Sequence, residues 1–255
     1  MRRITLPGWR VPILMYHRVT PAEPGPGDYF FSISRRRFAQ QMHYLQRLRF
    51  HVVTLEQIVD WLRRGRALPP RPVAITFDDG YADTYRLAVP ILRELRFPAT
   101  FFLVSDHVGG TSRWEAESGC AGQPLIGWEE ARDLARQGFT IGSHTRSHAV
   151  LTTLSDERLR AELLESRVII ERQVKTPIRF FAYPRNRTDA RCQEAVRAAG
   201  YEGACAGDGL GYHPWCLDRV DVSHASPAAF LAKVSPWFYA FRRARIRVTG
   251  SLQHP

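Results

Sequence analysis

The chain has 255 residues, of which 44% are hydrophobic and 24% charged, and its 36 Lys and Arg against 25 Asp and Glu give a formal net charge of +11. This length suits one large α/β domain, and the composition is ordinary for a globular protein, which argues against a disordered chain. The positive charge favours an acidic neighbour, either a polyanion or an anionic membrane surface, although a high-GC genome would produce the same arginine bias without any function.

No stretch of the sequence reaches the roughly 18 apolar residues of a membrane-spanning helix, and the basic amino terminus lacks the apolar segment of a signal peptide. We therefore expect a cytoplasmic protein, with peripheral binding at the inner face of the membrane as an open alternative. The four cysteines have no CxxC spacing, which argues against a zinc finger: Cys120, Cys192, Cys205 and Cys216. We expect free thiols that pack in the core, and one disulfide stays an alternative.

Short apolar runs and helical spacings alternate along the chain. The first half predicts strands at 11–17, 51–53, 73–77 and 99–104, and helices at about 34–48, 55–62 and 83–95. The second half predicts helices at 128–137, 155–174, 189–199 and from 227 onward, and strands at 140–143, 178–183, 201–205 and 220–222. The predicted loops are 21–27, 105–126 and 207–218.

This alternation predicts an α/β fold, a (β/α) barrel or a close relative of one. No internal repeat or composition shift marks a boundary, so we expect a single domain over residues 1–255. A basic helix or tail over 227–255 carries Arg242, Arg243, Arg245 and Arg247, a group that fits docking at anionic lipid.

Two adjacent carboxylates, Asp78 and Asp79, follow the apolar run 73–77 and precede Gly80. Buried carboxylates are costly unless they are paired or bind a metal ion, and the carboxyl ends of strands are where α/β folds place their chemistry. The alternative is that Asp78 caps the next helix and that Asp79 is solvated. The partners described next favour the chemical interpretation.

Two histidines four residues apart, His144 and His148, follow the predicted strand 140–143. They are expected at the same barrel face as the two aspartates, where both could bind one metal ion. Two histidines and one carboxylate are a common catalytic zinc set that leaves a position open for water. The second aspartate would then be free to act as a base. The alternative is a pair of solvent-facing loop histidines.

Three motifs in this order and spacing resemble the polysaccharide deacetylase family, the NodB-homology group or carbohydrate esterase family four: Thr76–Gly80, Ser143–His148 and Phe181–Pro184. The resemblance covers roughly residues 10–225, and residues 12–17 resemble the branch that deacetylates poly-N-acetylglucosamine. It implies a distorted (β/α) barrel of about seven strands that usually binds zinc, or in some members cobalt or nickel. It also implies Asp79, His144 and His148 as metal ligands and Asp78 as the general base.

The general acid and the residue that orients the base depart from the family's usual motifs. Most members place the acid histidine in a Leu-x-His motif near the carboxyl end, which Val222–His224 matches poorly and Leu14–His17 matches better. Because a closed barrel places its first and last strands side by side, we favour His17 over His224. The alternative for His17 is a satisfied core histidine.

The usual arginine before the Pro-aromatic turn is replaced by Ala182. Arg179 lies an odd number of positions away and so points to the opposite face, which leaves Arg219 as the expected substitute. Asn186 stands where the family has glycine. Tyr183, Pro184, Arg219 and Trp114 are the expected substrate-side residues, with Tyr183 and Trp114 stacking on sugars; a core or lid role for Trp114 is equally open.

These observations predict a metal-dependent N-deacetylase that acts on an N-acetylated sugar in a polymer, an oligomer or a lipid-linked precursor. The alternative is a catalytically inactive glycan-binding module of the same fold. Nucleic-acid binding is suggested only by charge and lacks a binding motif. A metallopeptidase is disfavoured because no Glu follows His144.

Overall fold

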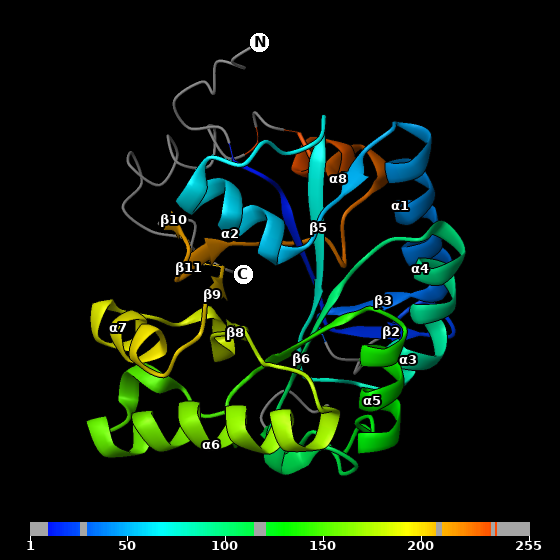
Figure 1. Ribbon diagram of the computed structural model, residues 1–255. Coiled ribbons are helices and arrows are strands. Elements are labelled where there is room, and N and C mark those ends of the chain that lie inside the picture. The colour runs from blue at the N-terminus through cyan, green and yellow to red at the C-terminus, as the bar shows by residue number, and fades with distance from the viewer. Residues whose placement is uncertain (1–9, 26–29, 115–120, 208–210, 236–237, 239–255) are drawn as a thin grey trace.

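The computed structural model describes residues 10–25, 30–114, 121–207, 211–235 and 238. Its helices surround a strongly curled sheet (Figure 1). The helices are α1 (Arg35–Arg47), α2 (Leu55–Arg64), α3 (Ala82–Leu87), α4 (Val89–Leu95), α5 (Trp128–Arg136), α6 (Asp156–Val174), α7 (Ala190–Ala198) and α8 (Pro227–Lys233). The strands are β1 (Ile13–Tyr16), β2 (Arg18–Thr20), β3 (Ser32–Ser34), β4 (His51–Val52), β5 (Pro72–Phe77), β6 (Thr100–Leu103), β7 (Thr140–Ser143), β8 (Phe180–Ala182), β9 (Gly203–Ala206), β10 (Tyr212–His213), β11 (Cys216–Asp218) and β12 (Val220–Asp221).

The main sheet is parallel apart from its β10–β11 edge, and its order is β10-β11-β9-β8-β7-β6-β5-β1-β12. The segment Cys216–Asp221 closes it, because β11 pairs with β9 while β12 pairs with β1, where Leu14 lies opposite Val220. The backbone N–H of Arg219, between β11 and β12, donates to the Ala206 carbonyl. The predicted distorted barrel is therefore confirmed, with its first and last strands side by side.

Alternation along the strands separates the barrel interior from the layer beneath the helices. On β5, Ala74 packs in one cluster with residues of β1, β6, β8, β9 and β11, whereas Val73, Ile75 and Phe77 pack in the larger cluster with the surrounding helices. Helix α2 contributes Ile58 to the interior cluster, at the end of the barrel where β4 meets the start of β5. At the opposite end of the barrel, where the parallel strands end, the residues that follow the strands lie in loops.

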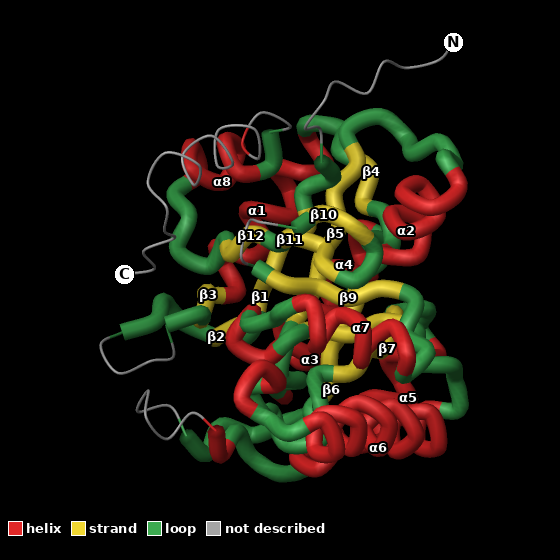
Figure 2. Tube along the Cα trace, turned by 90° about the vertical axis from the view of Figure 1, so that its left-hand side faces the viewer, coloured by secondary structure: helices red, strands yellow, loops and turns green. Residues whose placement is uncertain are grey.

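Residues that follow four of these strands therefore lie at one rim. His17 follows β1, Asp78 follows β5, His144 follows β7 and Tyr183 follows β8. Figure 2 shows the strands of the barrel gathered at the centre, with α6 and α7 packed along one side. The fold thus brings together residues that lie as far apart in the sequence as His17 and Tyr183, and the rim is where a functional site is expected.

The structure corrects two expectations about the elements and adds one feature that was not predicted. The helix predicted over 83–95 is divided into α3 and α4, because Pro90 at the start of α4 has no N–H to donate to the preceding turn. The predicted loop 207–218 contains β10 and β11 among its described residues. A small parallel sheet of β2 and β3 was not predicted.

Some expectations concern residues that the structure does not describe. Cys192 and Cys205 are buried free thiols and Cys216 is buried, whereas Cys120 lies outside the described residues. Helix α8 begins at Pro227 as predicted, but the arginines of the basic tail at 242–247 lie outside the described residues. Within the part of the chain that the structure describes, no helix is long and apolar enough to cross a bilayer.

Candidate metal centre and active site

The turn after β5 is built to present Asp79. Both Asp79, with φ +70°, and Gly80, with φ +76°, are in the left-handed region. A Cβ at Gly80 would be strained at this φ and would lie 2.8 Å from Leu103 Cδ2, which would have to move, so glycine is favoured there. Asp79 itself occupies a conformation that costs a non-glycine residue about 1 kcal/mol or more. Backbone strain of this kind, at the carboxyl end of a barrel strand, indicates a functional turn.

Three potential ligand atoms converge beside this turn. Asp79 Oδ1 lies 3.4 Å from His144 Nε2 and 3.3 Å from His148 Nε2, and one donor atom from each residue lies within 4.8 Å of the others. Two ligands about 2.0–2.1 Å from a tetrahedral ion are separated by about 3.3 Å. The spacing of these donors therefore fits a divalent metal ion.

The surroundings of Asp79 also fit a cation. Its side chain is buried, yet neither carboxylate oxygen receives a hydrogen bond from any described residue. Burial alone would raise the pKa of Asp79, but the facing His148, with smaller contributions from His17 and His144, holds it well below its usual range. A buried, ionised carboxylate without donors is costly unless it binds a positive charge.

The two histidines are held in different ways. The Nδ1–H of His144 donates to the Ala182 carbonyl at 2.8 Å, which fixes the tautomer that leaves Nε2 free as a ligand. Burial is the largest influence on His144 and lowers its pKa to about 4, so its ring is neutral near pH 7. His148 instead stacks on Trp114, with ring centroids 4.6 Å apart and planes 16° from parallel. No described residue accepts or donates a hydrogen bond at its Nδ1.

Asp78 and Arg219 form a buried, bidentate ion pair. Arg219 Nη1 donates to Asp78 Oδ1 and Arg219 Nη2 donates to Asp78 Oδ2, both at 2.6 Å. Burial alone would raise the pKa of Asp78, but the charge of Arg219, followed by that of His144, keeps it below its usual value. Asp78 is therefore an ionised carboxylate in a fixed orientation next to Asp79.

Further contacts hold Arg219 in place. Its Nη1 donates to Thr76 Oγ1 at 3.3 Å, and its Nη2 donates to Asn186 Oδ1 at 3.2 Å. Thr76 was part of a recognised motif and Asn186 was noted only as a departure from glycine, so neither contact was predicted. No local pattern could reveal them, because both depend on where β12 lies relative to β5 and to the turn after β8.

The two histidines considered for the acid role lie in different surroundings. His17 is buried, its Nε2 lies 3.9 Å from Asp78 Oδ2, and its ring stacks on Phe31 at 4.7 Å between centroids. His224 is exposed, and its Nε2 contacts the Phe30 carbonyl. Of these two histidines, His17 is therefore the one that the fold places beside Asp78.

The expected stacking role of Tyr183 is wrong. Its side chain is fully buried, its hydroxyl donates to the Trp215 carbonyl at 3.0 Å, and its backbone N–H donates to Cys205. Pro184 is buried as well. The ring packs beneath the turn because it extends the alternation of β8 into the core, so neither side chain is presented to a sugar. Trp114 is half-buried against His148 and remains at the rim.

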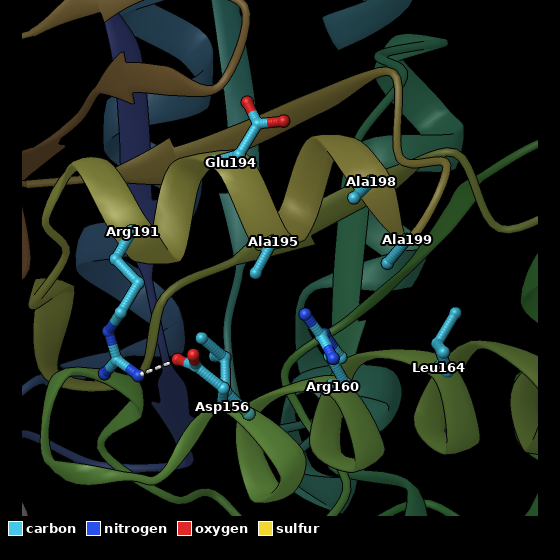
Figure 3. Close-up of a pocket in the computed structure, with 9 residues that line it drawn as sticks. Asp156, Arg160, Leu164, Arg191, Glu194, Ala195, Ala198 and Ala199 are labelled. Carbon is cyan, nitrogen blue, oxygen red and sulfur yellow. Dashed lines mark hydrogen bonds and ion pairs between the residues drawn. The ribbon is translucent and has the colours of Figure 1, made fainter.

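A separate hollow lies on the outside of the barrel, between α6 and α7 (Figure 3). It has a volume of about 480 Å³ and an apolar floor that includes Leu159 and Ala195, and Arg191 at its edge pairs with Asp156 at 2.8 Å. It shares no residue with the rim site. It contains none of the converging metal ligands, so we place the chemistry at the rim.

Comparison with known proteins identifies the family. The family model described as polysaccharide deacetylase matches residues 65–204, more than half of the chain and the part that contains Asp78, Asp79 and both histidines. The chain belongs to the polysaccharide deacetylase family. The resemblance noted from the three motifs is thereby confirmed, and members of this family act on N-acetylated glycans with the help of a metal ion.

Individual members of the family show the same relationship. The poly-beta-1,6-N-acetyl-D-glucosamine N-deacetylase of Staphylococcus aureus (strain N315) is 26% identical over 190 residues, which covers 67% of this chain and 63% of that protein. IcaB from Ammonifex degensii is 26% identical in sequence, with a TM-score of 0.71 over 92% of this chain and 98% of that one. The Streptococcus pyogenes deacetylase PplD, in complex with acetate, is 21% identical with a TM-score of 0.75 over 89% and 98%, which supports the fold. The chain spans 54 to 63% of the length of its curated Bacillus and Staphylococcus relatives.

Proposed function

We propose that this chain is a metal-dependent N-deacetylase that hydrolyses the acetamide of N-acetylated sugars in a polysaccharide, an oligosaccharide or a lipid-linked glycan. One observation carries the proposal. Asp79, His144 and His148 converge on one point, and the ionised Asp78 is held next to them by Arg219. Family membership supplies the reaction class, and this arrangement supplies the groups that the reaction requires.

Zinc is the metal that we propose, because two imidazoles and one carboxylate in tetrahedral spacing are typical of catalytic zinc; cobalt or nickel would also accept these ligands. Asp79, His144 and His148 would hold the ion. When bound, such an ion makes water a stronger nucleophile and polarises an amide carbonyl.

The protein's own groups then move the protons. Asp78 accepts a proton from the attacking water as the water oxygen bonds to the acetamide carbon. His17 donates a proton to the sugar nitrogen as the carbon–nitrogen bond breaks, because an amide nitrogen leaves poorly without one. The products are acetate and a free amino sugar. The position of His17 Nε2, 3.9 Å from Asp78 Oδ2, supports the acid role for His17 over His224.

The substrate class follows from the relatives. The Staphylococcus and Escherichia relatives are named as poly-beta-1,6-N-acetyl-D-glucosamine N-deacetylases, so an N-acetylglucosamine polymer is the substrate class that we propose here. The catalytic domain is about residues 10–225, a range that contains the whole barrel from Ile13 to Asp221. The arginines at 242–247 would let the protein dock on anionic lipid, and absence of co-sedimentation with phosphatidylglycerol vesicles would remove that part.

The test is acetate release from N-acetylglucosamine oligomers by zinc-loaded protein, compared with the Asp78→Asn variant. The proposal predicts release by the wild-type protein and a loss of about 10²-fold or more in the variant, because the base is removed. Oligomer binding without acetate release, in a protein that binds no metal, would instead establish the glycan-binding module.

A further inference from the structure

The loop that carries the two histidines is strained at both ends. Thr145 has φ +69° and His148 has φ +64°, and a left-handed β-branched residue is a marked outlier. The side chain of Thr145 is buried, and no described residue forms a hydrogen bond with its hydroxyl. The two residues between them, Arg146 and Ser147, must therefore be held in place by contacts from outside the loop.

His148 depends on that loop more than His144 does. His144 is oriented by its hydrogen bond to Ala182, whereas no described residue bonds to Nδ1 of His148. Apart from its stacking on Trp114 and an edge contact with the His144 ring, with centroids 4.9 Å apart, the position of the His148 ring is set by the backbone that carries it. Any group that fixes this backbone also fixes the distance of 3.3 Å between His148 Nε2 and Asp79 Oδ1.

The carbonyls of Thr145 and Arg146 accept the backbone N–H groups of Ser105 and Asp106. Glu162, on α6, holds the N–H groups of the same loop. Its Oε2 accepts the backbone N–H of Arg146 at 2.8 Å and the backbone N–H of Ser147 at 2.9 Å. Its Oε1 accepts the Ser147 hydroxyl at 2.6 Å. One half-buried carboxylate thus holds two consecutive amides and a side chain, and bonds from a charged acceptor are stronger than neutral ones.

The neighbouring acid on α6 acts elsewhere. Glu165 lies one turn further along and, within the described part of the chain, pairs with the guanidinium of Arg146, whose Nε also donates to Asp106 at 2.7 Å. Removing Glu165 therefore leaves the backbone of the loop bonded to Glu162 and leaves Arg146 with one partner. The two glutamates form a matched pair in which only Glu162 touches the strained backbone.

We propose that Glu162 is a positioning residue of the metal centre, which holds His148 in its metal-binding position through the amides of Arg146 and Ser147. This inference rests on the proposed function, since it takes Asp79, His144 and His148 as the metal ligands. It extends the site to a helix that contributes no ligand.

The test measures the affinity of the metal-free protein for Zn²⁺ by competition with a chromophoric chelator, which does not depend on activity. Glu162→Gln keeps the size of the side chain but turns one acceptor into a donor facing the loop. We expect it to weaken Zn²⁺ binding about tenfold, the usual effect of a lost outer-shell partner. Glu165→Gln is the control and should bind like the wild type. Ser147→Ala removes one of the three bonds and should weaken binding less than Glu162→Gln.

The thermal unfolding midpoint of each metal-free variant separates positioning from a general loss of stability. Weaker Zn²⁺ binding by Glu162→Gln with an unchanged midpoint supports the proposal, as does an altered visible spectrum of its Co²⁺ form. Wild-type affinity in both Glu162→Gln and Ser147→Ala would overturn it, as would equal losses in the two glutamate variants. Unchanged affinity in His148→Ala would overturn the metal centre itself, a result distinct from failure of Glu162 alone.

Discussion

Arg219 and Asp78 lie on opposite sides of the seam where the last strand of the barrel meets the first strands, and they form two parallel hydrogen bonds of 2.6 Å in the buried interior. The pair explains how the carboxylate of Asp78 can stay ionised although it is buried. A lysine could supply the same charge but not the planar fork that fixes both carboxylate oxygens.

The first prediction concerns this fork. Arg219→Lys should reduce the rate of acetate release about 10- to 100-fold, because Asp78 loses its fixed orientation and a misplaced catalytic group can cost about that much. Zinc content should be unchanged, because the hydrogen bonds of the guanidinium described above go to Asp78, Thr76 and Asn186, which are not metal ligands. Arg179→Lys is the control: Arg179 pairs with Glu202 and Glu56 on the surface, so its replacement should leave the rate unchanged. Equal losses in the two variants would contradict the role of the fork.

Replacing Asp78 and replacing Asp79 should have different effects on zinc binding and on acetate release. Asp78→Asn should bind one zinc ion per chain and lose acetate release, because it removes the base and leaves the ligands. Asp79→Asn should bind zinc much more weakly, because it removes the anionic ligand that faces both histidines. Zinc content by atomic absorption after gel filtration measures the difference. The assignment is wrong if Asp78→Asn is the variant that loses the metal.

His17 and His224 can be compared in the same way for the role of general acid. His17→Gln should reduce acetate release about 10²- to 10⁴-fold, the range for loss of a general acid or base. His224→Gln should have little effect, since His224 is exposed and contacts Phe30 rather than the aspartates. A substrate with a better leaving group, such as an N-acetyl anilide, should be less sensitive to His17→Gln, because its nitrogen needs a proton less. The opposite order of sensitivity would argue against an acid at this position.

A prediction about stability tests the barrel core. A Cβ at Gly142 on β7 would lie 2.4 Å and 2.5 Å from two ring atoms of Phe102 and 3.0 Å from the Phe180 carbonyl oxygen. Gly142→Ala should therefore lower the free energy of unfolding by about 1–3 kcal/mol through overpacking. Gly25→Ala, where a Cβ would meet nothing within 4 Å, is the matched control. Denaturant unfolding of the metal-free proteins measures both, and equal stability would contradict the packing described for the interior.

The ligands and the base could be predicted from the sequence because each belongs to a short motif at the end of a strand. Asp78 and Asp79 follow six consecutive buried residues, and His144 and His148 lie four positions apart in the loop after β7. Arg219 could be predicted less directly, by excluding Arg179 on strand alternation, and the surface pairs of Arg179 agree with that exclusion. Closure of the barrel could be predicted from the alternation of strands and helices.

The positions of the Tyr183 and Glu162 side chains could not be predicted from the sequence. Tyr183 was expected at the rim because of its motif, but its burial depends on the carbonyl of Trp215, 32 positions away. Glu162 is one of several glutamates on α6, and nothing in its local sequence marks it as a contact of the histidine loop. Both depend on how α6, β8 and the segment after β9 pack against one another.

The most direct test of the account is to titrate the chelator-treated, metal-free protein with Zn²⁺ while acetate release from N-acetylglucosamine oligomers is followed. The account predicts no release without metal and a rise that ends at one zinc ion per chain, with no rise in His148→Ala under the same conditions. Release that persists in the metal-free protein, or that is the same in His148→Ala as in the wild type, would contradict it.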